Sequence, residues 1–288
     1  MVKFCHIAPT AFLGAFTRTN GAHLILAHLV EQDPVYREFY RSLDDGKQKI
    51  MDNSAFEMYK QGRPMYSTDD LLPMAEACRA DMIVMSDYPG EHSSKTIDAA
   101  RETAPIYQDA GYETFFVPQS EVGDLEDYLY CMEWALDEGR KYVDRIGLSI
   151  LGCPNAFGVE KDNKLQRYMS RYRILEILTQ RGVFNCYRDH DNIFHCLGMV
   201  DGPNEITLLE PWHRHIATWD SSAAVWAGLN NIRFDNSPTG LVDGKFEKEV
   251  EFDYPASLGS PWKDAVGLDQ LNSVMYNINF IDELTGAI

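Results

Sequence analysis

The chain has 288 residues, of which 45% are apolar and 12% aromatic, so it can bury a large core and is neither a disordered nor a fibrous protein. No run approaches the roughly 18 apolar residues that span a bilayer, and the N-terminal residues lack the pattern of a secretory signal, so we expect a cytoplasmic protein without a membrane partner. The net charge of −18 opposes binding to a polyanion, because that affinity comes from Lys and Arg side chains.

Eight short apolar runs, rich in β-branched and aromatic residues, recur along the chain and are candidate strands. In chain order they cover residues 2–8, 23–29, 48–53, 81–87, 114–119, 145–151, 192–200 and 215–220. The second run is typical of the start of a helix as well as of a strand. Helical patterns separate many of the runs. One of them, in residues 124–139, places its apolar stripe at Leu125, Tyr128, Leu129 and Met132.

Strands that alternate with helices predict parallel strands joined by right-handed crossovers. Eight of them predict an α/β fold of the TIM type, a closed (β/α)8 barrel, with an open doubly wound sheet as the alternative. We expect a single domain over residues 1–288, in which residues 229–288 form an irregular or helical C-terminal wrap. The six cysteines include no C-x-x-C pair, and no glycine-rich loop marks a nucleotide site, so we expect buried thiols and no cofactor.

One segment, residues 161–181, is basic within this acidic chain and is the best candidate for contact with a polyanion. It carries six basic and two acidic side chains. If it is helical, Lys164, Arg167 and Arg171 share one face, which would form a nucleic-acid-binding surface. The alternative is the solvated face of an ordinary amphipathic helix.

Polar residues follow several of the predicted strands. Asp52, Asp87 and Asp220 each end a run, and so does Gln119. Any one of them is explained by a helix N-cap or a turn. In a (β/α) barrel, however, the carboxyl ends of all strands meet at one mouth, where the active site is built. Carboxylates gathered there are costly to bury unless they are paired or used, so the sequence predicts an active site that contains these residues.

The segment IMDNSAFEMY at 50–59 resembles the D-S-G-G-[FY]-Q segment of the tRNA-guanine transglycosylases, in the form found in their phage and bacterial DNA-modifying relatives, the 7-deazaguanine DNA transglycosylases. Further segments are similar in the family's order: MIVMSD, VPQS, RIGLSILG, FHCLGMVDGPNE and ATWDSSA. The likeness covers roughly residues 1–230, and it rests on order and spacing more than on identity.

The resemblance implies base exchange at a nucleotide. Asp220 would attack the anomeric carbon and expel guanine, which leaves a covalent aspartyl-sugar ester. Asp52 would protonate the leaving base and take a proton from the incoming one. Asp87 would accept hydrogen bonds from the N1 and 2-amino groups of the base. The target nucleotide must first be flipped out of its stack.

The resemblance also implies the remaining contacts of the base. Gln119 and the backbone at Gly147 and Leu148 would donate to its O6 atom. Phe56 would cover one face of the ring. Leu197, followed by Gly198, would cover the other face.

The sequence departs from the family in ways that change what is expected. The tRNA-modifying members carry a zinc subdomain with a C-x-C-x-x-C motif, and this chain has no cysteine beyond Cys196, so we expect no metal and no such subdomain. Ser54 and Ala55 replace paired glycines, and the residues after Asp220 differ from the family's nucleophile segment. These losses favour DNA over tRNA as the polymer and preQ0 or a derivative as the incoming 7-deazaguanine. If the protein is of phage origin, its location is the host cytoplasm, where a partner protein would supply basic surface.

Two other classes of function fit the sequence. A metal-dependent TIM-barrel hydrolase would use His213 and His215, which lie on one side of an extended segment, with His6, His190 or His195 and the strand-end aspartates. A non-catalytic module that binds a base or a nucleic acid would keep the pocket without the chemistry. Asp52 and Asp220 together argue against this module, because the binding of a neutral base requires neither carboxylate.

Overall fold

The computed structural model describes residues 2–184, 190–199, 203–235 and 266–286. Each of the eight apolar runs forms a strand. The strands are β1 (Lys3–His6), β2 (His23–Leu26), β3 (Lys49–Asp52), β4 (Met82–Val84), β5 (Glu113–Phe116), β6 (Arg145–Ser149), β7 (Phe194–Leu197) and β8 (Ile216–Ser221).

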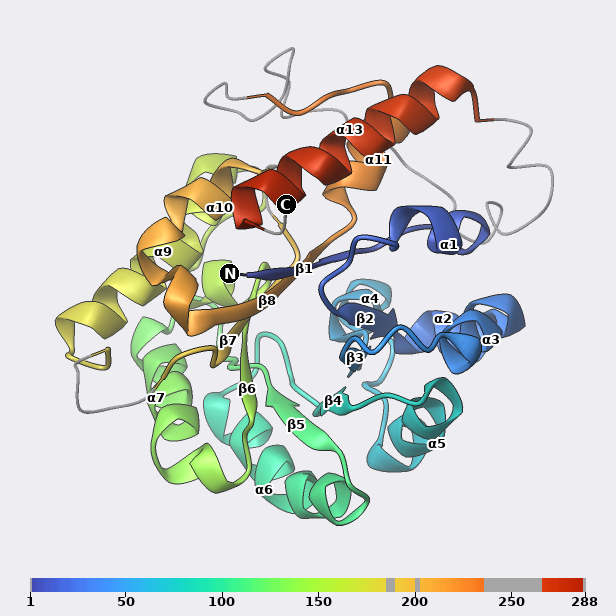
Figure 1. The fold of residues 1–288 in the computed structure, drawn as a ribbon. Coiled ribbons are helices and arrows are strands. Elements are labelled where there is room, and N and C mark those ends of the chain that lie inside the picture. Colours follow the sequence, from blue (N-terminus) through green and yellow to red (C-terminus); the bar gives the residue numbers. More distant parts are fainter. Residues whose placement is uncertain (1, 185–189, 200–202, 236–265, 287–288) are drawn as a thin grey trace.

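The strands form one parallel sheet that curls into a nearly closed barrel (Figure 1). Their order is β1-β8-β7-β6-β5-β4-β3-β2, and backbone hydrogen bonds join each strand to the next one in this order. The barrel is closed where β1 and β2, the two ends of this order, approach each other. At the seam between β1 and β2, the amide of Gly21 donates to the carbonyl of Phe4 at 2.9 Å. The Asn20 side chain also bonds both backbone groups of His6. This arrangement confirms the predicted TIM-type barrel over the open doubly wound sheet.

Helices follow most strands and surround the barrel. The α-helices are α1 (Leu13–Phe16), α2 (Ala27–Gln32), α3 (Pro34–Ser42), α4 (Ala55–Gln61), α5 (Thr68–Cys78), α6 (Ser93–Asp109), α7 (Leu125–Leu136), α8 (Gly152–Ala156), α9 (Lys164–Gln180), α10 (Asn204–Leu208), α11 (Ala223–Leu229) and α13 (Leu268–Thr285). The 3-10 helices in the described part of the chain are η1 (Thr10–Phe12), η2 (Glu138–Lys141) and η3 (Glu210–His215). Polar caps start several of them: Asp33 accepts from the amide of Val35 at α3, and Asp124 accepts from that of Asp127 at α7.

The second apolar run contains both of the elements that its pattern allowed. Its first residues form β2, and α2 begins at Ala27, directly after the last strand residue, Leu26. The strand residues pair with β3 from His23 to Leu26. A single stretch of apolar residues therefore forms a strand of the barrel and then, with no loop between them, the start of a helix.

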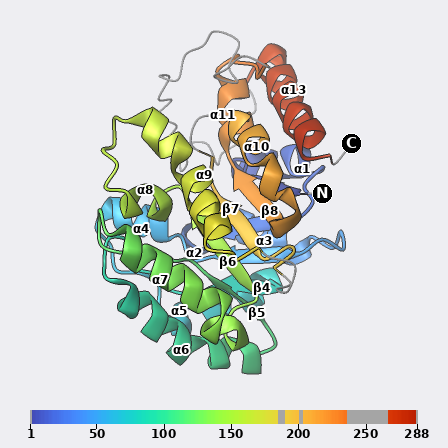
Figure 2. The ribbon, with the colours of Figure 1, turned by 90° about the vertical axis from the view of Figure 1, so that its left-hand side faces the viewer.

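Two apolar layers hold the fold together, one inside the barrel and one between the strands and the helices. The α7 stripe lies in the outer layer, where Tyr128, Leu129 and Met132 are fully buried. Helices α7 and α9 cover the same side of the barrel (Figure 2), and Arg181, just after α9, pairs with Glu126 and Glu133 of α7.

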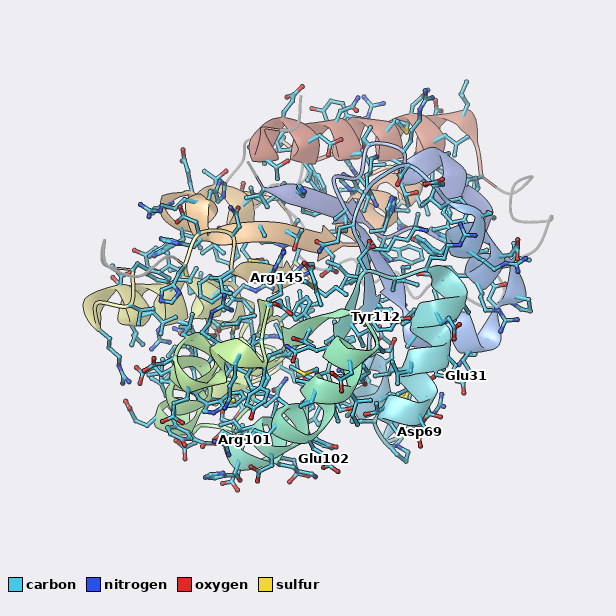
Figure 3. The ribbon with its side chains drawn as sticks, turned by 60° about the horizontal axis from the view of Figure 1, so that its bottom comes forward. Glu31, Asp69, Arg101, Glu102, Tyr112 and Arg145 are labelled. Atoms are coloured by element: carbon cyan, nitrogen blue, oxygen red, sulfur yellow. The ribbon has the colours of Figure 1, made fainter. Side chains whose placement is uncertain are left out.

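The barrel interior also holds charge. Arg145, at the start of β6, lies near the middle of the molecule in the view from below (Figure 3). Glu31, Asp69 and Arg101, by contrast, belong to the outer helices in the same view. Because successive strand residues face opposite sides, Arg145 and Gly147 point into the barrel while Leu148 points toward the helices.

The C-terminal helix α13 lies across α11 and beside β1, so the last helix and the first strand are neighbours (Figure 1). Nε2 of His6 in β1 and Oδ1 of Asp282 in α13 are 3.0 Å apart, and both side chains are buried. The expected C-terminal wrap thus includes a long helix, whereas residues 236–265 lie outside the described part. Within that described part, no helix is both long enough and apolar enough to span a membrane.

We predict that the contact between α11 and α13 tolerates no extra methyl group. A Cβ at Gly228 would lie 2.6 Å from Cγ2 of Val274 and closer still to its backbone. Gly228→Ala should therefore lower the free energy of unfolding by about 1–3 kcal/mol, measured by thermal or urea unfolding. Gly14→Ala is the control, because its nearest neighbour, Phe39, is 3.9 Å away. An unchanged stability in Gly228→Ala would contradict the close packing of these helices.

Candidate active site

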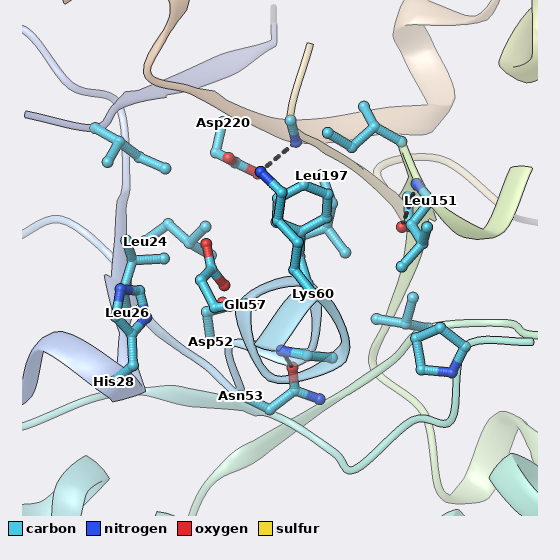
Figure 4. Close-up of a pocket in the computed structure, with 18 of the residues that line it drawn as sticks. Leu24, Leu26, His28, Asp52, Asn53, Glu57, Lys60, Leu151, Leu197 and Asp220 are labelled. Atoms are coloured by element: carbon cyan, nitrogen blue, oxygen red, sulfur yellow. Dashed lines mark hydrogen bonds between the residues drawn. The ribbon is translucent and has the colours of Figure 1, made fainter. Parts of the chain in front are cut away.

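A cavity of about 580 Å³ opens at the carboxyl ends of the strands. Figure 4 shows Asp52, Glu57 and Asp220 facing it from β3, α4 and β8. Polar lining residues come from the ends or following loops of β3, β4, β5, β6 and β8, as a TIM-type barrel places them. They include Asp52, Asn53, Glu57, Lys60, Asp87, Gln119, Ser149, Asp220, Ser221 and Ser222.

Asp220, near the end of β8, is buried, and one of its oxygens is held from two sides. Its Oδ1 atom lies 2.9 Å from Nε2 of His195 and accepts a hydrogen bond of 3.1 Å from the amide of Gly198. Both contacts fall on Oδ1, so Oδ2 carries neither of them. The carboxylate is thereby fixed in orientation while it lines the cavity.

Arg171 fixes the backbone that provides this amide. It is buried in α9, pairs with Glu205 at 3.1 Å, and donates to the carbonyls of Leu197 and Gly198 at the end of β7. The indole of Trp219 donates to the same Gly198 carbonyl at 2.9 Å. The predicted role of Arg171 on an exposed nucleic-acid-binding face is therefore wrong. The amphipathic pattern of the helix turns this residue inward, where a buried carboxylate compensates its charge.

The other two residues of that predicted basic face differ from Arg171. Arg167 is partly exposed, and its guanidinium donates to the carbonyl of Lys161 at 3.2 Å. Lys164 begins α9, but its side chain lies outside the described part. Contact of this helix with a nucleic acid stays a prediction.

Asp52 ends β3 and begins the turn into α4. Its Oδ2 atom accepts a 2.9 Å hydrogen bond from the amide of Ser54, whose backbone is left-handed with a φ of 54°. The Ser54 hydroxyl lies 2.9 Å from Nδ1 of His28. This left-handed turn replaces the glycine pair of the resembled segment and leaves Asp52 facing the cavity.

Two carboxyl groups in the cavity hold their protons unusually tightly. Burial, followed by the charges of Glu57 and Asp220, raises the pKa of Asp52 well above its ordinary value. Burial, with a smaller contribution from Asp220, raises the pKa of Glu57 to about 7. Both carboxyl groups therefore keep a proton to higher pH than an ordinary carboxyl does, which suits a proton donor.

Asp87 is buried beyond the end of β4 between two amide side chains. Nδ2 of Asn53 donates to its Oδ1 at 2.7 Å, and Nε2 of Gln119 donates to its Oδ2 at 2.6 Å. Burial raises the pKa of Asp87 to about 6 although both amides favour its ionised form. Each carboxylate oxygen retains a second lone pair for a ligand.

Gln119 is oriented differently from the sequence-based expectation. Its Nε2 atom bonds Asp87, and its buried Oε1 has no hydrogen-bond partner among the described residues. The amide thus donates to Asp87, where donation to a ligand oxygen was expected. Its oxygen is shielded from solvent and lies near Gly152, whose added Cβ would be 3.1 Å away.

Gly147 and Leu148, predicted to contact a base through their backbone, are not among the residues that line the cavity. A Cβ at Gly147 would lie 2.8 Å from both Leu197 and Phe115, so the glycine makes room for side chains inside the barrel. Leu148 is fully buried on the helical side of β6. The cavity wall starts only at the next residue, Ser149.

Phe56, Leu197 and Gly198 do line the cavity. The ring of Phe56 is 39% exposed, and Nζ of Lys60 lies 5.5 Å from its centre. Gly198 has a φ of 71°, a left-handed conformation that favours glycine, and its amide faces Asp220. The site thus has two apolar walls and a cation at its rim.

Three of the histidines named by the metal-hydrolase alternative make their contacts away from the cavity. His213 and His215 belong to η3, not to an extended segment; Nε2 of His213 bonds the Ile206 carbonyl, and Nδ1 of His215 bonds that of His190. His6 contacts Asp282. Among the residues that the structure describes, no group of three or more His, Cys, Asp or Glu side chains is arranged to hold a metal ion.

Sequence reasoning missed four residues of this site: Asn53, Glu57, Lys60 and His195 as a partner of Asp220. Asn53, Glu57 and Lys60 follow Asp52 so closely that helix start and spacing could have placed them at the same mouth. No local sequence pattern indicated the role of His195, because its contact with Asp220 is made between two different strands.

No model of a protein family matches the chain, and no curated protein is significantly similar to it.

We predict a pH-dependent stabilisation when Glu57 loses its charge. The folded state holds the Glu57 proton up to about pH 7, while the unfolded chain releases it near 4.5. The protonated group therefore favours folding at low pH, and this contribution is lost as pH rises through about 7. Glu57→Gln should melt at a higher temperature than wild type at pH 8 and at nearly the same temperature at pH 5. Glu102→Gln, on the exposed side of α6, is the control, and a shift equal at both pH values would contradict the prediction.

Proposed function

We propose that the protein is a transglycosylase that exchanges guanine in DNA for a 7-deazaguanine, preQ0 or a derivative of it. The observation that carries this proposal is that Asp52 and Asp220, from β3 and β8, line one cavity with different environments. Burial and the neighbouring charges raise the pKa of Asp52, and Asp220 is oriented by two hydrogen bonds on Oδ1. An acid beside an oriented carboxylate is the pair that a retaining glycosyl transfer requires.

In the proposed reaction, Oδ2 of Asp220 attacks the anomeric carbon of the flipped nucleotide. The bond between sugar and guanine breaks, its electron pair goes to the base, and Asp52 donates its proton to that base. The product is an ester between Asp220 and the sugar. The incoming base then gives a proton to Asp52 and attacks the same carbon, which releases Asp220.

Recognition of the base is assigned to the buried cluster of Asp87, Asn53 and Gln119. The two carboxylate oxygens of Asp87, which Asn53 and Gln119 hold in place, are acceptors that match the N1 and 2-amino donors of a guanine-like ring. Phe56 and Leu197 supply the apolar surfaces for its two faces. The pattern of acceptors thus favours a ring rich in donors.

The choice of DNA rests on the resemblance and on the parts of the tRNA-modifying proteins that this sequence lacks. A chain with a net charge of −18 needs local positive surface to hold a polyanion. Lys60 at the cavity is one local cation, Arg167 of α9 is another, and a partner protein is proposed to supply more. The same exchange on tRNA is the competing outcome.

The decisive test combines guanine-containing DNA or tRNA with candidate 7-deazaguanines and measures the nucleosides by mass spectrometry. Wild type should incorporate the base into DNA. Incorporation into tRNA alone would reverse the choice of polymer, and a lack of incorporation into either would reject the transglycosylase.

We predict that replacing Asp220 and replacing Asp52 impair different steps of the exchange. Asp220→Ala should lower exchange by at least about 1,000-fold yet leave binding of the base, measured by calorimetry, nearly intact. Asp52→Asn should slow release of guanine, because the acid is lost. Asp109→Asn, an exposed change at the end of α6, should do neither. Full exchange activity in Asp220→Ala would remove this residue from the mechanism.

A further inference from the structure

A chain of polar side chains crosses the barrel interior and ends on Asp220. Nη1 of Arg145 donates to Oγ1 of Thr218 at 3.1 Å, and that hydroxyl lies 2.6 Å from Nδ1 of His195. Nε2 of His195 then lies 2.9 Å from Oδ1 of Asp220. The four residues come from β6, β7 and β8, which are neighbours in the sheet. Arg145 is the first residue of β6, so it joins this chain from the end of the strands opposite the cavity.

Chemistry fixes the direction of these hydrogen bonds. Burial lowers the pKa of His195, so the imidazole is neutral at pH 7 and carries one N–H group. The carboxylate of Asp220 only accepts, which places that hydrogen on Nε2. Nδ1 is then an acceptor, and the Thr218 hydroxyl donates to it. Arg145, which only donates, turns the Thr218 hydroxyl in that direction by occupying one of its lone pairs.

Burying this series of polar side chains costs a free energy of desolvation that packing alone would not require. Thr218 and His195 are almost fully shielded from solvent, with exposures of 1% and 0%, where apolar side chains would pack without a desolvation cost. The ring of His195 packs against Phe115 at 5.2 Å, which limits its rotation. Its one polar contact toward the cavity is on the oxygen of Asp220 that the proposed attack does not use.

We propose that His195, oriented by Thr218 and Arg145, is a positioning residue that holds Oδ1 of Asp220 and so presents Oδ2 to the substrate. This inference rests on the proposed function for the role of Asp220. His195 touches no reacting atom. It acts by restricting the carboxylate to one orientation before the sugar arrives, which removes part of the entropic cost of attack.

The first experiment tests the hydrogen-bond chain in the resting protein, without any substrate. Nitrogen-15 NMR of the histidine rings distinguishes the two neutral tautomers, and His195→Gln identifies the resonances of this ring. We expect the hydrogen on Nε2 in wild type and also in Thr218→Val, because Asp220 still requires a donor there, while the Nδ1 resonance shifts when its hydroxyl partner is lost. A hydrogen on Nδ1 in wild type would overturn the inference, whatever the enzyme does.

The second experiment tests the effect on exchange. His195→Leu should lower kcat about 100-fold while KM stays within about threefold of wild type, because orientation and not binding is lost. His195→Gln retains a donor near Nε2 and should recover to within about tenfold of wild type. Thr218→Val, nearly the same shape as threonine, should lower kcat about tenfold, whereas Thr218→Ser keeps the hydroxyl and most activity.

Thr114→Val is the matched control. Thr114 is a buried strand residue whose hydroxyl donates to the Tyr142 carbonyl at 2.7 Å, far along the sheet from Asp220. It should lose stability without a change in kcat. If wild type exchanges bases and folded Thr218→Val and His195→Leu do so equally well, the positioning role fails while the proposed function stands. If the tautomer is as expected but wild type exchanges nothing, the proposed function fails while the hydrogen-bond chain stands.

Discussion

The burial of several carboxyl groups around one cavity is the constraint on which the rest of the site depends. Like charges that share a poorly solvated space cannot all ionise at neutral pH. The protein resolves this by giving each carboxyl a different environment: the pKa of Asp52 is raised by burial and nearby charges, Asp87 lies between two amides, and Asp220 is held by His195 and the Gly198 amide. These differences are what separate an acid, a recognition group and a nucleophile in the proposed reaction.

The barrel achieves this by using both sides of its strands. Inward-facing residues of β6, β7 and β8 support Asp220 from beneath, and Gly147 leaves the space that Leu197 and Phe115 need. Outside the same strands, the Arg171–Glu205 pair holds the carbonyls at the end of β7 and so aims the Gly198 amide. Charged groups inside the barrel and in the helical layer thus both fix the positions of residues at the carboxyl ends of the strands.

The acceptor-rich cavity also limits what it can bind. Asp87 and Asp220 offer oxygens, and Lys60 is a cation beside Phe56. A ligand must therefore bring hydrogen-bond donors, because covering these oxygens with apolar groups would leave them unsatisfied at a cost. The proposed guanine-like base meets this demand through its ring and amino N–H groups.

The sequence by itself determined the barrel and its mouth. Eight continuous apolar runs, which are typical of strands buried on both faces, all became strands, and the aspartates that end them reached one cavity because parallel strands end together. Periodicity also placed α7 and α9.

Only the tertiary structure decided which side chains meet. Arg171 is buried because Glu205 and the end of β7 lie beneath it, and helical periodicity alone does not reveal a buried ion pair. Gly147 and Leu148 lie below the cavity because the wall begins one residue later, at Ser149. His195 joins Asp220 across two strands, a contact fixed by barrel register and not by any local pattern. Local sequence sets strands and their ends, whereas contacts between strands depend on how the sheet closes.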